Sequence, residues 1–483
     1  MFNDFKIVLG IAPTRRQMYD PKYAIENKRR IIAKVKELTK DDVNVEIHDI
    51  DWLNEEGILI KGSDSETVAE YFKSKHVDAL FVPFCNYGSE EAVGRLGRSM
   101  GVPFLLYGAR DEFPPEEGMR VRQTDTQCGM LPASKVLQRY GVKFTYIENC
   151  WLDDPAFSKG FDNFLRVATV VKKFKRLRVG QMSLRPAPFV CCAYNEGELL
   201  EKLGIEVVPI SPLTLERSIK NIIETRADEC KEVIAQYKDS WTVCDPETDP
   251  RMAELKKQSG MARRFGLITD IDDRMMAHAA MRIAILELAK ENQLDAMGVE
   301  CWMATMYAGI AACAVFGDII EQGLPIGCET DVMCAITQVI LEAASRGEKK
   351  AFCADVTMRH PTNDNAELLW HCGPFPVCTA RKDKPAENRN MRGWFEVEHG
   401  DITISRLDTL DGKYSLLAGE GKGVDGPPTN GTYSWFEVKD WVAFEKKLIY
   451  GPYIHHVAGI HGHYGDVLEE ACRYLPVAID RAE

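Results

Sequence analysis

The first quarter of the chain alternates short apolar strands with amphipathic helices, and this pattern most constrains the fold. The strands are expected at residues 7–12, 44–50, 79–84 and 103–107. Strands separated by helices form a parallel βαβ sheet, whose binding edge lies at the carboxyl ends of the strands. No Gly-x-Gly-x-x-Gly follows any of these strands, which disfavours a dinucleotide as the ligand.

The pattern of apolar residues changes twice in the rest of the chain. From residue 150, strands at 177–183, 206–210 and 295–299 and helical stretches at 213–237 and 270–291 indicate a second α/β unit. After Gly393, β-branched and aromatic residues alternate, and the turn pairs Asp411-Gly412 and Asn430-Gly431 separate the runs. This pattern predicts an antiparallel barrel or sandwich, followed by a histidine-rich loop and a last helix at 466–474.

The predicted fold class is therefore α/β, with two Rossmann-like parallel α/β domains followed by a C-terminal antiparallel β-barrel-like domain. The N-terminal α/β domain is expected to span residues 1–149. The central α/β domain is expected to span residues 150–348. The C-terminal domain, with the barrel and the histidine loop, is expected to span residues 349–483. A chain of 483 residues exceeds what one core supports.

Charge and cysteine content exclude several classes of protein. A net charge of −13 argues against nucleic acid as a partner, because binding requires Lys and Arg to neutralise phosphates. No apolar run is long enough to span a membrane, and the N-terminus has no signal-peptide pattern. The 15 cysteines are odd in number and include no Cys-x-x-Cys pair. We expect a cytoplasmic protein with reduced thiols.

Two acidic residues each follow an apolar run that reads as a buried strand. Glu329 follows residues 324–328 and Asp355 follows residues 350–354, so both are expected at strand ends, although an acid there is often only the N-cap of a helix. Four of the ten histidines fall within residues 455–463. Two carboxylates and one imidazole suit Mn²⁺ or Mg²⁺, and such a site serves proton transfer next to a carbonyl.

Several segments resemble the L-fucose isomerase and L-arabinose isomerase superfamily, in particular its shorter fucose-isomerase-like members. In the C-terminal half the resemblance rests on Glu300-Cys301-Trp302, Pro325-Ile326-Gly327-Cys328-Glu329-Thr330-Asp331-Val332, Ala354-Asp355-Val356 and His371-Cys372-Gly373-Pro374. In the N-terminal half it rests on Pro13-Thr14-Arg15-Arg16, Asn86-Tyr87-Gly88-Ser89-Glu90 and Cys150. The resemblance covers most of the chain.

This resemblance implies an aldose–ketose isomerase that acts on a free sugar or deoxysugar through an enediol. It implies Mn²⁺, with Mg²⁺ or Co²⁺ as alternatives, bound by Glu329, Asp355 and His456. The two acids would also be the catalytic pair that moves the proton between C1 and C2. The resemblance further implies a homo-oligomer, a trimer or hexamer, with active sites near subunit contacts.

Four further residues are candidates for sugar binding. By resemblance to the arabinose-isomerase pattern, His455 faces the sugar while His456 binds the metal. His371 is a competing metal ligand, a sugar contact or a core histidine bonded to the backbone. Trp302 stacks on the sugar or packs in the core. Arg16 contacts hydroxyls from a neighbouring subunit or lies in solvent.

The sequence does not name the sugar, and two other functions stay open. The chain is shorter than typical fucose isomerases, and the segment after Asp355 lacks the Asn-rich run of that family. Arg359 and His360 follow Asp355 and could read an anionic substituent. One alternative is a non-catalytic sugar-binding or regulatory protein. The other is an epimerase or lyase that uses the same metal site on a modified ketose.

Overall fold

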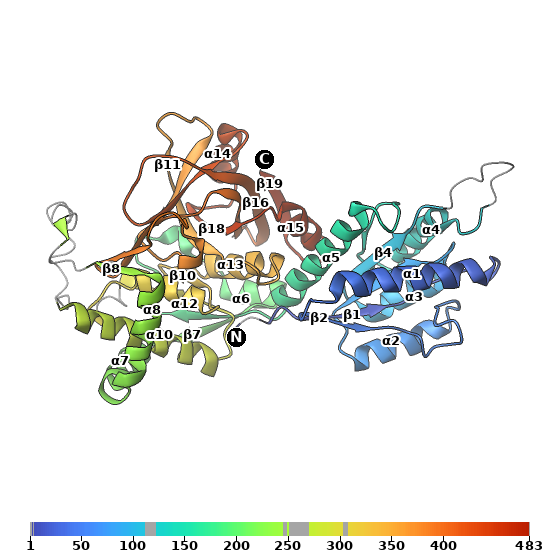
Figure 1. The fold of residues 1–483 in the computed structure, drawn as a ribbon, viewed down its shortest axis with the longest axis horizontal. Helices are drawn as coiled ribbons and strands as arrows, with labels where there is room; N and C mark the ends of the chain where they lie inside the picture. The colour runs from blue at the N-terminus through green and yellow to red at the C-terminus, as the bar shows by residue number, and fades with distance from the viewer. Residues whose placement is uncertain are drawn as a thin grey trace. The chain divides into compact units, whose positions relative to one another are not determined.

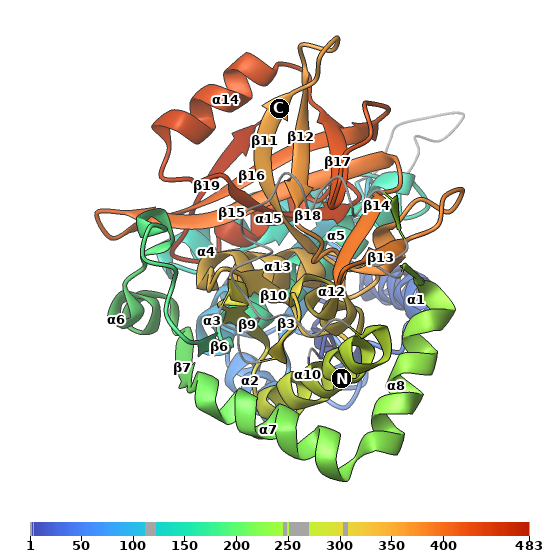
Figure 2. The ribbon, with the colours of Figure 1, turned by 90° about the vertical axis from the view of Figure 1, so that its left-hand side faces the viewer.

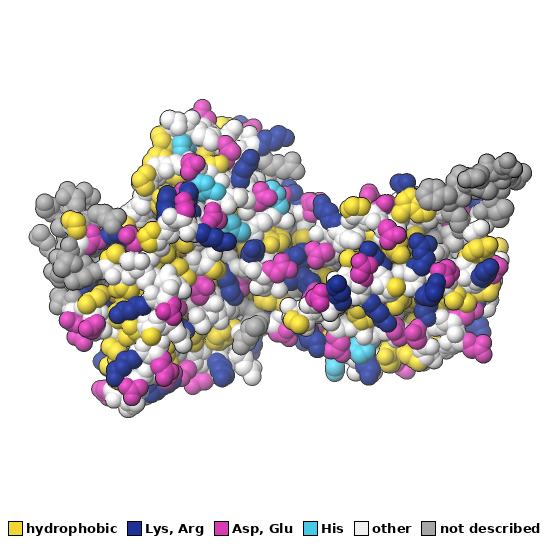
Figure 3. All heavy atoms as spheres, in the orientation of Figure 1, with side chains coloured by type: hydrophobic (Ala, Val, Ile, Leu, Met, Phe, Trp, Pro, Cys, Tyr) yellow, Lys and Arg dark blue, Asp and Glu magenta, His cyan; other side chains and the backbone are white. Residues whose placement is uncertain are grey.

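A computed structural model of the chain describes residues 2, 4–111, 122–244, 249–250, 270–302 and 308–482. The chain forms two compact units, one of Phe5–Lys172 and the other chiefly of Lys173–Glu483. None of the helices in the described ranges is long and apolar enough to cross a bilayer. On the face drawn in Figure 3, the described basic and acidic side chains are interspersed and do not form a basic stripe.

A five-stranded parallel sheet in the order β2-β1-β3-β4-β5 is the centre of the first unit (Figure 1). The strands are β1 (Ile7–Ile11), β2 (Val45–His48), β3 (Ala79–Phe84), β4 (Phe104–Gly108) and β5 (Thr145–Tyr146). The helices are α1 (Pro21–Thr39), α2 (Asp64–Ser74), α3 (Glu90–Met100), α4 (Thr126–Arg139) and α5 (Pro155–Phe174). Successive β3 side chains face opposite sides, so Phe81 packs with α1 and α5 while Leu80 and Val82 pack with α2, α3 and α4. The predicted βαβ sheet is confirmed.

The larger unit begins with a second parallel sheet, of order β10-β9-β6-β7. Its strands are β6 (Arg178–Met182), β7 (Glu206–Ile210), β9 (Ala296–Val299) and β10 (Ile326–Cys328). The helices around it are α6 (Glu196–Glu198), α7 (Pro212–Thr225), α8 (Ala227–Ser240), α10 (Ile271–Glu291), α12 (Cys313–Glu321) and α13 (Val332–Ala344). A second α/β unit after residue 150 was predicted, and its strands lie where the apolar runs indicate.

The helical stretch predicted at 213–237 is two helices, α7 and α8, rather than one. The chain breaks at Arg226, whose φ of −132° and ψ of 36° are not helical. The Arg226 guanidinium bonds to Glu229 of α8 and to Glu287 of α10, at 2.7 Å in each case. The break allows both helices to pack against α10, and the apolar spacing alone does not reveal it.

The C-terminal part is a closed antiparallel barrel in the order β16-β15-β18-β11-β12-β17, and pairing of β16 with β17 closes it (Figure 2). The barrel strands are β11 (Phe352–Arg359), β12 (Ala366–His371), β15 (Gly400–Leu410), β16 (Lys413–Val424), β17 (Thr432–Glu437) and β18 (His456–His461). The flanking elements are β8 (Thr242–Cys244), β13 (Glu387–Arg389), β14 (Arg392–Glu396), α14 (Trp441–Tyr450), α15 (Gly465–Cys472) and β19 (Ala478–Ala482). Asp411 and Gly412 join β15 to β16 with φ of 53° and 72°, as the Asp-Gly pair predicts. The barrel and the predicted fold class are confirmed.

Two local expectations about the candidate site residues are wrong. Asp355 does not end a strand of a parallel sheet, because β11 continues to Arg359 as an antiparallel barrel strand. Residues 357–359 of β11 are exposed, so no apolar run marks the part of the strand that continues past Asp355. The histidine-rich segment is also not a loop, because His456 to His461 form β18 between β11 and β15.

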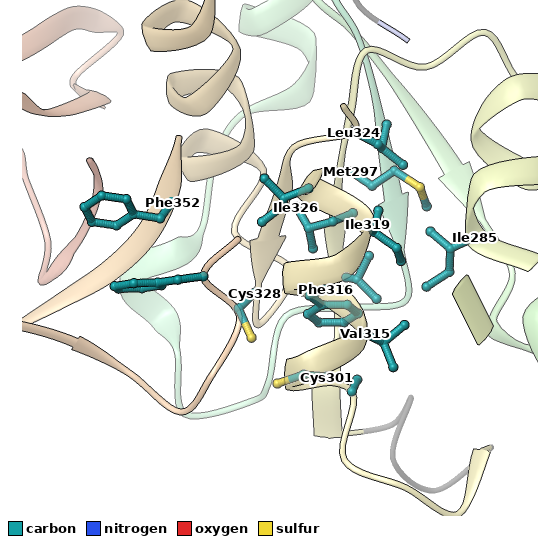
Figure 4. Close-up of a cluster of buried hydrophobic side chains, with 14 of the residues drawn as sticks. Ile285, Met297, Cys301, Val315, Phe316, Ile319, Leu324, Ile326, Cys328 and Phe352 are labelled. Carbon is teal, nitrogen blue, oxygen red and sulfur yellow. The ribbon is translucent and has the colours of Figure 1, made fainter. Parts of the chain in front are cut away.

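Helix α13 joins the second sheet to the barrel, and every one of its residues is buried. It packs against β9 and β10 of the sheet and against β15 and β18 of the barrel. Figure 4 shows part of the same core, which runs from Met297 and Ile326 on the sheet, past Phe316 on α12, to Phe352 on β11. The core fixes the end of β10, where Glu329 lies, against the barrel strand that carries Asp355.

Candidate active site

Three side chains from distant parts of the sequence meet at one end of the barrel. His456 Nε2 lies 3.3 Å from Glu329 Oε2 and 3.4 Å from Asp355 Oδ1. The β-sheet register explains the second distance, because Asp355 of β11 is the direct antiparallel partner of His456 of β18. The side chains of Glu329 and Asp355 are 14% and 19% exposed, so small ligands can reach this otherwise buried cluster.

A tight turn directs Glu329 toward the barrel. Glu329 and Thr330 both have left-handed backbones, with φ of 58° and 59°, and such residues each cost about 1–3 kcal/mol. The turn also needs Gly327, where an added Cβ would lie 2.1 Å from the backbone oxygen of Asp331. Strained residues persist where the surroundings hold them, and they are concentrated at functional sites.

Asp331 fixes the orientation of His456. One Asp331 oxygen caps α13 by accepting from the Cys334 N–H at 2.8 Å, and the other lies 2.8 Å from His456 Nδ1. Arg406, which is buried, bonds to the same Asp331 oxygen at 2.5 Å. With Nδ1–H donating to Asp331, Nε2 is the nitrogen that faces Glu329 and Asp355.

Asp331 and His456 each shift the pKa of the other toward its charged form. Burial by itself would raise the pKa of Asp331, but Arg406 and His456 hold it well below its usual value. Burial would lower the pKa of His456, but the neighbouring groups, first Asp331 and then Cys192 and the nearby Glu329 carboxylate, hold it well above its usual value. The cluster of carboxylates therefore favours positive charge at the position of His456 Nε2.

The donor atoms fit a divalent cation. Asp355 Oδ1 and His456 Nε2 are buried polar atoms without a hydrogen-bond partner among the described residues, and such atoms are uncommon unless a ligand satisfies them. Asp355, His455 and His456 each offer a ligand atom within 4.8 Å of the other two. This group offers one carboxylate oxygen and two imidazole nitrogens, and Glu329 Oε2, 3.3 Å from His456 Nε2, is a further oxygen donor beside it. Oxygen and imidazole donors suit Mn²⁺ or a similar ion.

Two other groups have the spacing of a metal site but weaker chemistry. Cys192, Asp331 and His456 are close enough, yet Asp331 is already neutralised by Arg406. In a separate group, Glu396, His399 and Asp425 lie together. Three basic contacts already serve this group: Lys384 on Glu396 at 2.8 Å, and Arg381 on Glu396 and Asp425 at 3.5 Å.

The other predicted histidines are near the same cluster. The ring of His455 lies 4.3 Å from that of His456, and its side chain is on the exposed side. His371 is buried at the end of β12, and its ring lies 6.4 Å from that of His456. His371 Nδ1 accepts from the Cys372 N–H at 2.9 Å, while Nε2 has no hydrogen-bond partner among the described residues. Both histidines stay candidates for sugar or metal contact.

A loop after β6, residues 183–195, covers one side of the histidines and was not predicted to contribute. The ring of its Phe189 lies 6.2 Å from that of His456 and 5.6 Å from that of Trp302, in an edge-on arrangement. Trp302 is 44% exposed, so it is not a core tryptophan. A bond of 3.1 Å from Thr330 Oγ1 to the Leu184 carbonyl ties the loop to the Glu329 turn. Aromatic spacing in the sequence gives no signal for such a contact.

Two arginines, Arg16 and Arg359, are also candidates for sugar contact. Arg16 belongs to the first unit, where its guanidinium lies 4.0 Å from the centre of the Tyr87 ring and 3.6 Å from the Glu90 carboxylate. Arg359 is exposed, and it bonds to the Asp364 backbone carbonyl across the β11–β12 turn. Contact of either residue with a sugar stays a prediction.

Comparison with known proteins gives two family matches and several relatives. Residues 10–175 match the model described as "Fucose/sulfoquinovose isomerase, N-terminal domain", and residues 394–482 match "L-fucose isomerase, C-terminal domain". The chain is 24% identical to a sulfoquinovose isomerase of Alkalicoccus urumqiensis over 74% of each chain. It is 23% identical to a sulfoquinovose isomerase of Priestia aryabhattai over 86% of this chain and 87% of that one. Glu329 and Asp355 lie between the matched segments, and His456 lies in the second.

The two parallel sheets, the barrel and these matches define the class of protein as an aldose–ketose isomerase. More narrowly, the chain belongs to the L-fucose isomerase superfamily, as one of its fucose-isomerase-like members.

Proposed function

We propose that the protein interconverts an aldose and its ketose with a divalent metal ion and an enediol intermediate. One observation carries this proposal: Glu329 Oε2 and Asp355 Oδ1 both lie within 3.4 Å of His456 Nε2, at a partly exposed cluster. Two carboxylates at one cation can serve as ligands and as proton carriers.

Mn²⁺ is the proposed ion, with Mg²⁺ or Co²⁺ as alternatives, and Glu329, Asp355 and His456 are the proposed ligands. The bound ion would polarise the sugar carbonyl and hold the two neighbouring sugar oxygens. His455 and His371 border the same cluster and are proposed to contact the sugar.

In the proposed mechanism, one carboxylate removes the proton from the carbon next to the carbonyl and the proton returns to the neighbouring carbon. Glu329 and Asp355 are the candidate pair for this transfer. Asp331 and Arg406 do not touch the sugar, but they hold His456 in one orientation. Trp302 and Phe189 offer aromatic surface on which an apolar face of the sugar can pack.

The proposed substrate is a free sugar, and the names of the relatives point to sulfoquinovose. This aldose carries a sulfonate, so its enzyme needs a basic group to recognise the anion. We propose in addition that the active protein is a homo-oligomer, a trimer or hexamer, in which Arg16 of a neighbouring subunit faces the sugar. Sedimentation that finds a stable, active monomer would contradict this part.

The test uses metal-stripped protein with and without Mn²⁺, incubated in D₂O with sulfoquinovose and with a panel of unmodified aldoses and deoxyaldoses. NMR follows the proton at C2 and identifies the product. We expect exchange and ketose formation only when Mn²⁺ is present. Binding without turnover would support a sugar-binding protein, and a changed carbon skeleton or an epimer would support the lyase or epimerase alternatives.

A further inference from the structure

A second chemically active cluster lies beside the candidate metal site and consists of thiols. Cys313, at the start of α12, and Cys372, just after β12, have sulfur atoms 3.2 Å apart. Cys328 interacts with both Cys372 and Cys301. Figure 4 shows the sulfur atoms of Cys301 and Cys328 turned toward each other. Four thiols thus connect elements that are far apart in the sequence.

The thiol cluster is in direct contact with the site. Cys372 Sγ lies 3.3 Å from His371 Nδ1, which also accepts from the Cys372 N–H. Cys328 immediately precedes Glu329 in the strained turn. A change in the position of the Cys372 sulfur therefore alters contacts of His371 and of the strand that carries Glu329.

Among the two thiols at 3.2 Å, Cys372 is the accessible one. It is half-buried, whereas Cys313 is 5% exposed. A small oxidant can therefore reach Cys372, and Cys313 is the thiol that would complete the reaction. A disulfide needs an S–S distance of about 2.05 Å, so the two sulfurs must approach by roughly 1 Å, within the reach of side-chain rotation.

We propose that hydrogen peroxide oxidises Cys313 and Cys372 to a reversible disulfide, and that this bond lowers the isomerase activity. Cys372 sulfur attacks the peroxide, the O–O bond breaks, and a sulfenic acid and one water form. Cys313 sulfur then attacks the sulfenic sulfur, the S–O bond breaks, and a second water leaves with the thiol protons. The two thiols are oxidised by two electrons, and the peroxide is reduced.

The bond alters the site because it turns the Cys372 sulfur toward Cys313. The contacts of that sulfur with His371 and Cys328 are then lost or lengthened. Loss of a contact that orients a neighbour of a metal site commonly costs about 10–100-fold in activity or metal affinity. We expect the oxidised protein to be at least about tenfold less active and a thiol reductant to restore it.

Another thiol pair is an internal comparison. The sulfur atoms of Cys334 and Cys353 lie 2.8 Å apart, closer than those of Cys313 and Cys372. These two residues are 0% and 1% exposed, so a peroxide cannot reach them in the folded protein. Accessibility, rather than distance alone, predicts which pair reacts.

The experiment treats the full chain with a few equivalents of hydrogen peroxide, blocks free thiols and maps linked peptides without reduction. We expect the Cys313–Cys372 link, and no Cys334–Cys353 link, in the wild type. Cys313→Ala should abolish the link, and Cys313→Ser repeats the test if alanine impairs folding. Cys378→Ser, which removes an exposed thiol, should behave like the wild type.

The map and the activity assay separate two ways in which the proposal can fail. A Cys334–Cys353 link, or no link between Cys313 and Cys372, overturns the site itself, whatever the protein catalyses. A Cys313–Cys372 link with unchanged activity overturns the regulatory role. The activity assay rests on the proposed isomerase function, whereas the map of linked peptides does not. Failure of the isomerase proposal is therefore distinguishable from failure of the disulfide proposal.

Discussion

Asp331 and His456 illustrate how single residues acquire a role through their partners. Asp331 has no exposed surface, yet it bonds to the first turn of α13, to His456 and to Arg406. Because those partners belong to different elements, one carboxylate couples the Glu329 turn to the barrel. The following predictions therefore test two kinds of residue. Glu329 is proposed to act on the sugar, and Asp331 is proposed to position His456.

Glu329→Gln keeps the size of the side chain but removes its capacity to carry a proton. We expect kcat to fall by about 10²–10⁴-fold, the range in which general acid–base groups contribute. The measurement is the isomerase assay, with circular dichroism to confirm folding. Glu445→Gln, at an exposed position of α14, is the matched control and should retain full activity. Full activity of Glu329→Gln would contradict the assigned role.

Asp331→Asn tests the positioning role. The amide cannot neutralise Arg406, and breaking a buried ion pair on one side costs about 3–5 kcal/mol. His456 also loses its orienting acceptor, so Mn²⁺ affinity should fall about 10–100-fold. Calorimetry of Mn²⁺ binding and chemical denaturation measure the two effects. Unchanged metal affinity in a folded variant would show that Asp331 serves only stability.

At the scale of elements, α13 determines how the sheet and the barrel meet, and it carries a buried acid at its far end. Glu342 is fully buried, and its Oε1 accepts from the Ala351 N–H at 3.2 Å. Lys350 lies 3.9 Å from the other oxygen. Burial raises the pKa of Glu342 to about 7, and Lys350 only partly offsets this. The helix therefore holds a carboxyl group that binds a proton near neutral pH.

The raised pKa of Glu342 determines how the unfolding free energy changes with pH. The folded state keeps the Glu342 proton up to pH about 7, whereas the unfolded chain releases it near its ordinary value of 4.5. The unfolding free energy should therefore decline between these values, by an amount on the order of 3 kcal/mol that is fully lost above pH 7.

Glu342→Gln should remove that decline and stabilise the protein at pH 8 relative to the wild type. Urea denaturation at several pH values measures it, and Glu445→Gln is the exposed control. A variant whose stability falls with pH as steeply as that of the wild type would rule out Glu342 as the source.

At the scale of the whole molecule, a metal at the candidate site would join β10, β11 and β18 within the larger unit. A ligand that binds only the folded state stabilises it by about 2.7 kcal/mol at 100 times its Kd. We therefore expect added Mn²⁺ to raise the unfolding temperature of the metal-stripped protein and a chelator to reverse this. An Asp355→Asn variant should show a much smaller shift. An equal shift in wild type and variant would mean that Mn²⁺ binds elsewhere.

The sequence by itself determined the elements that depend on local pattern. Short apolar runs between stretches of helical spacing indicated the parallel strands, and side-chain alternation with the Asp411-Gly412 pair indicated the barrel hairpin, because these patterns and turn geometry are local properties. Glu329 and Asp355 were also selected from the sequence, because each follows an apolar run, while the choice of His456 came from the resemblance to the isomerase superfamily.

Only the tertiary structure decided how these parts meet. The pairing of β11 with β18 sets Asp355 beside His456, and the register between distant strands depends on how the whole barrel closes. The Arg406–Asp331 pair and the contact of Phe189 with the histidines are likewise invisible in sequence, because burial, and not spacing, creates them. Local pattern determines what a segment becomes, while long-range packing determines which segments become neighbours.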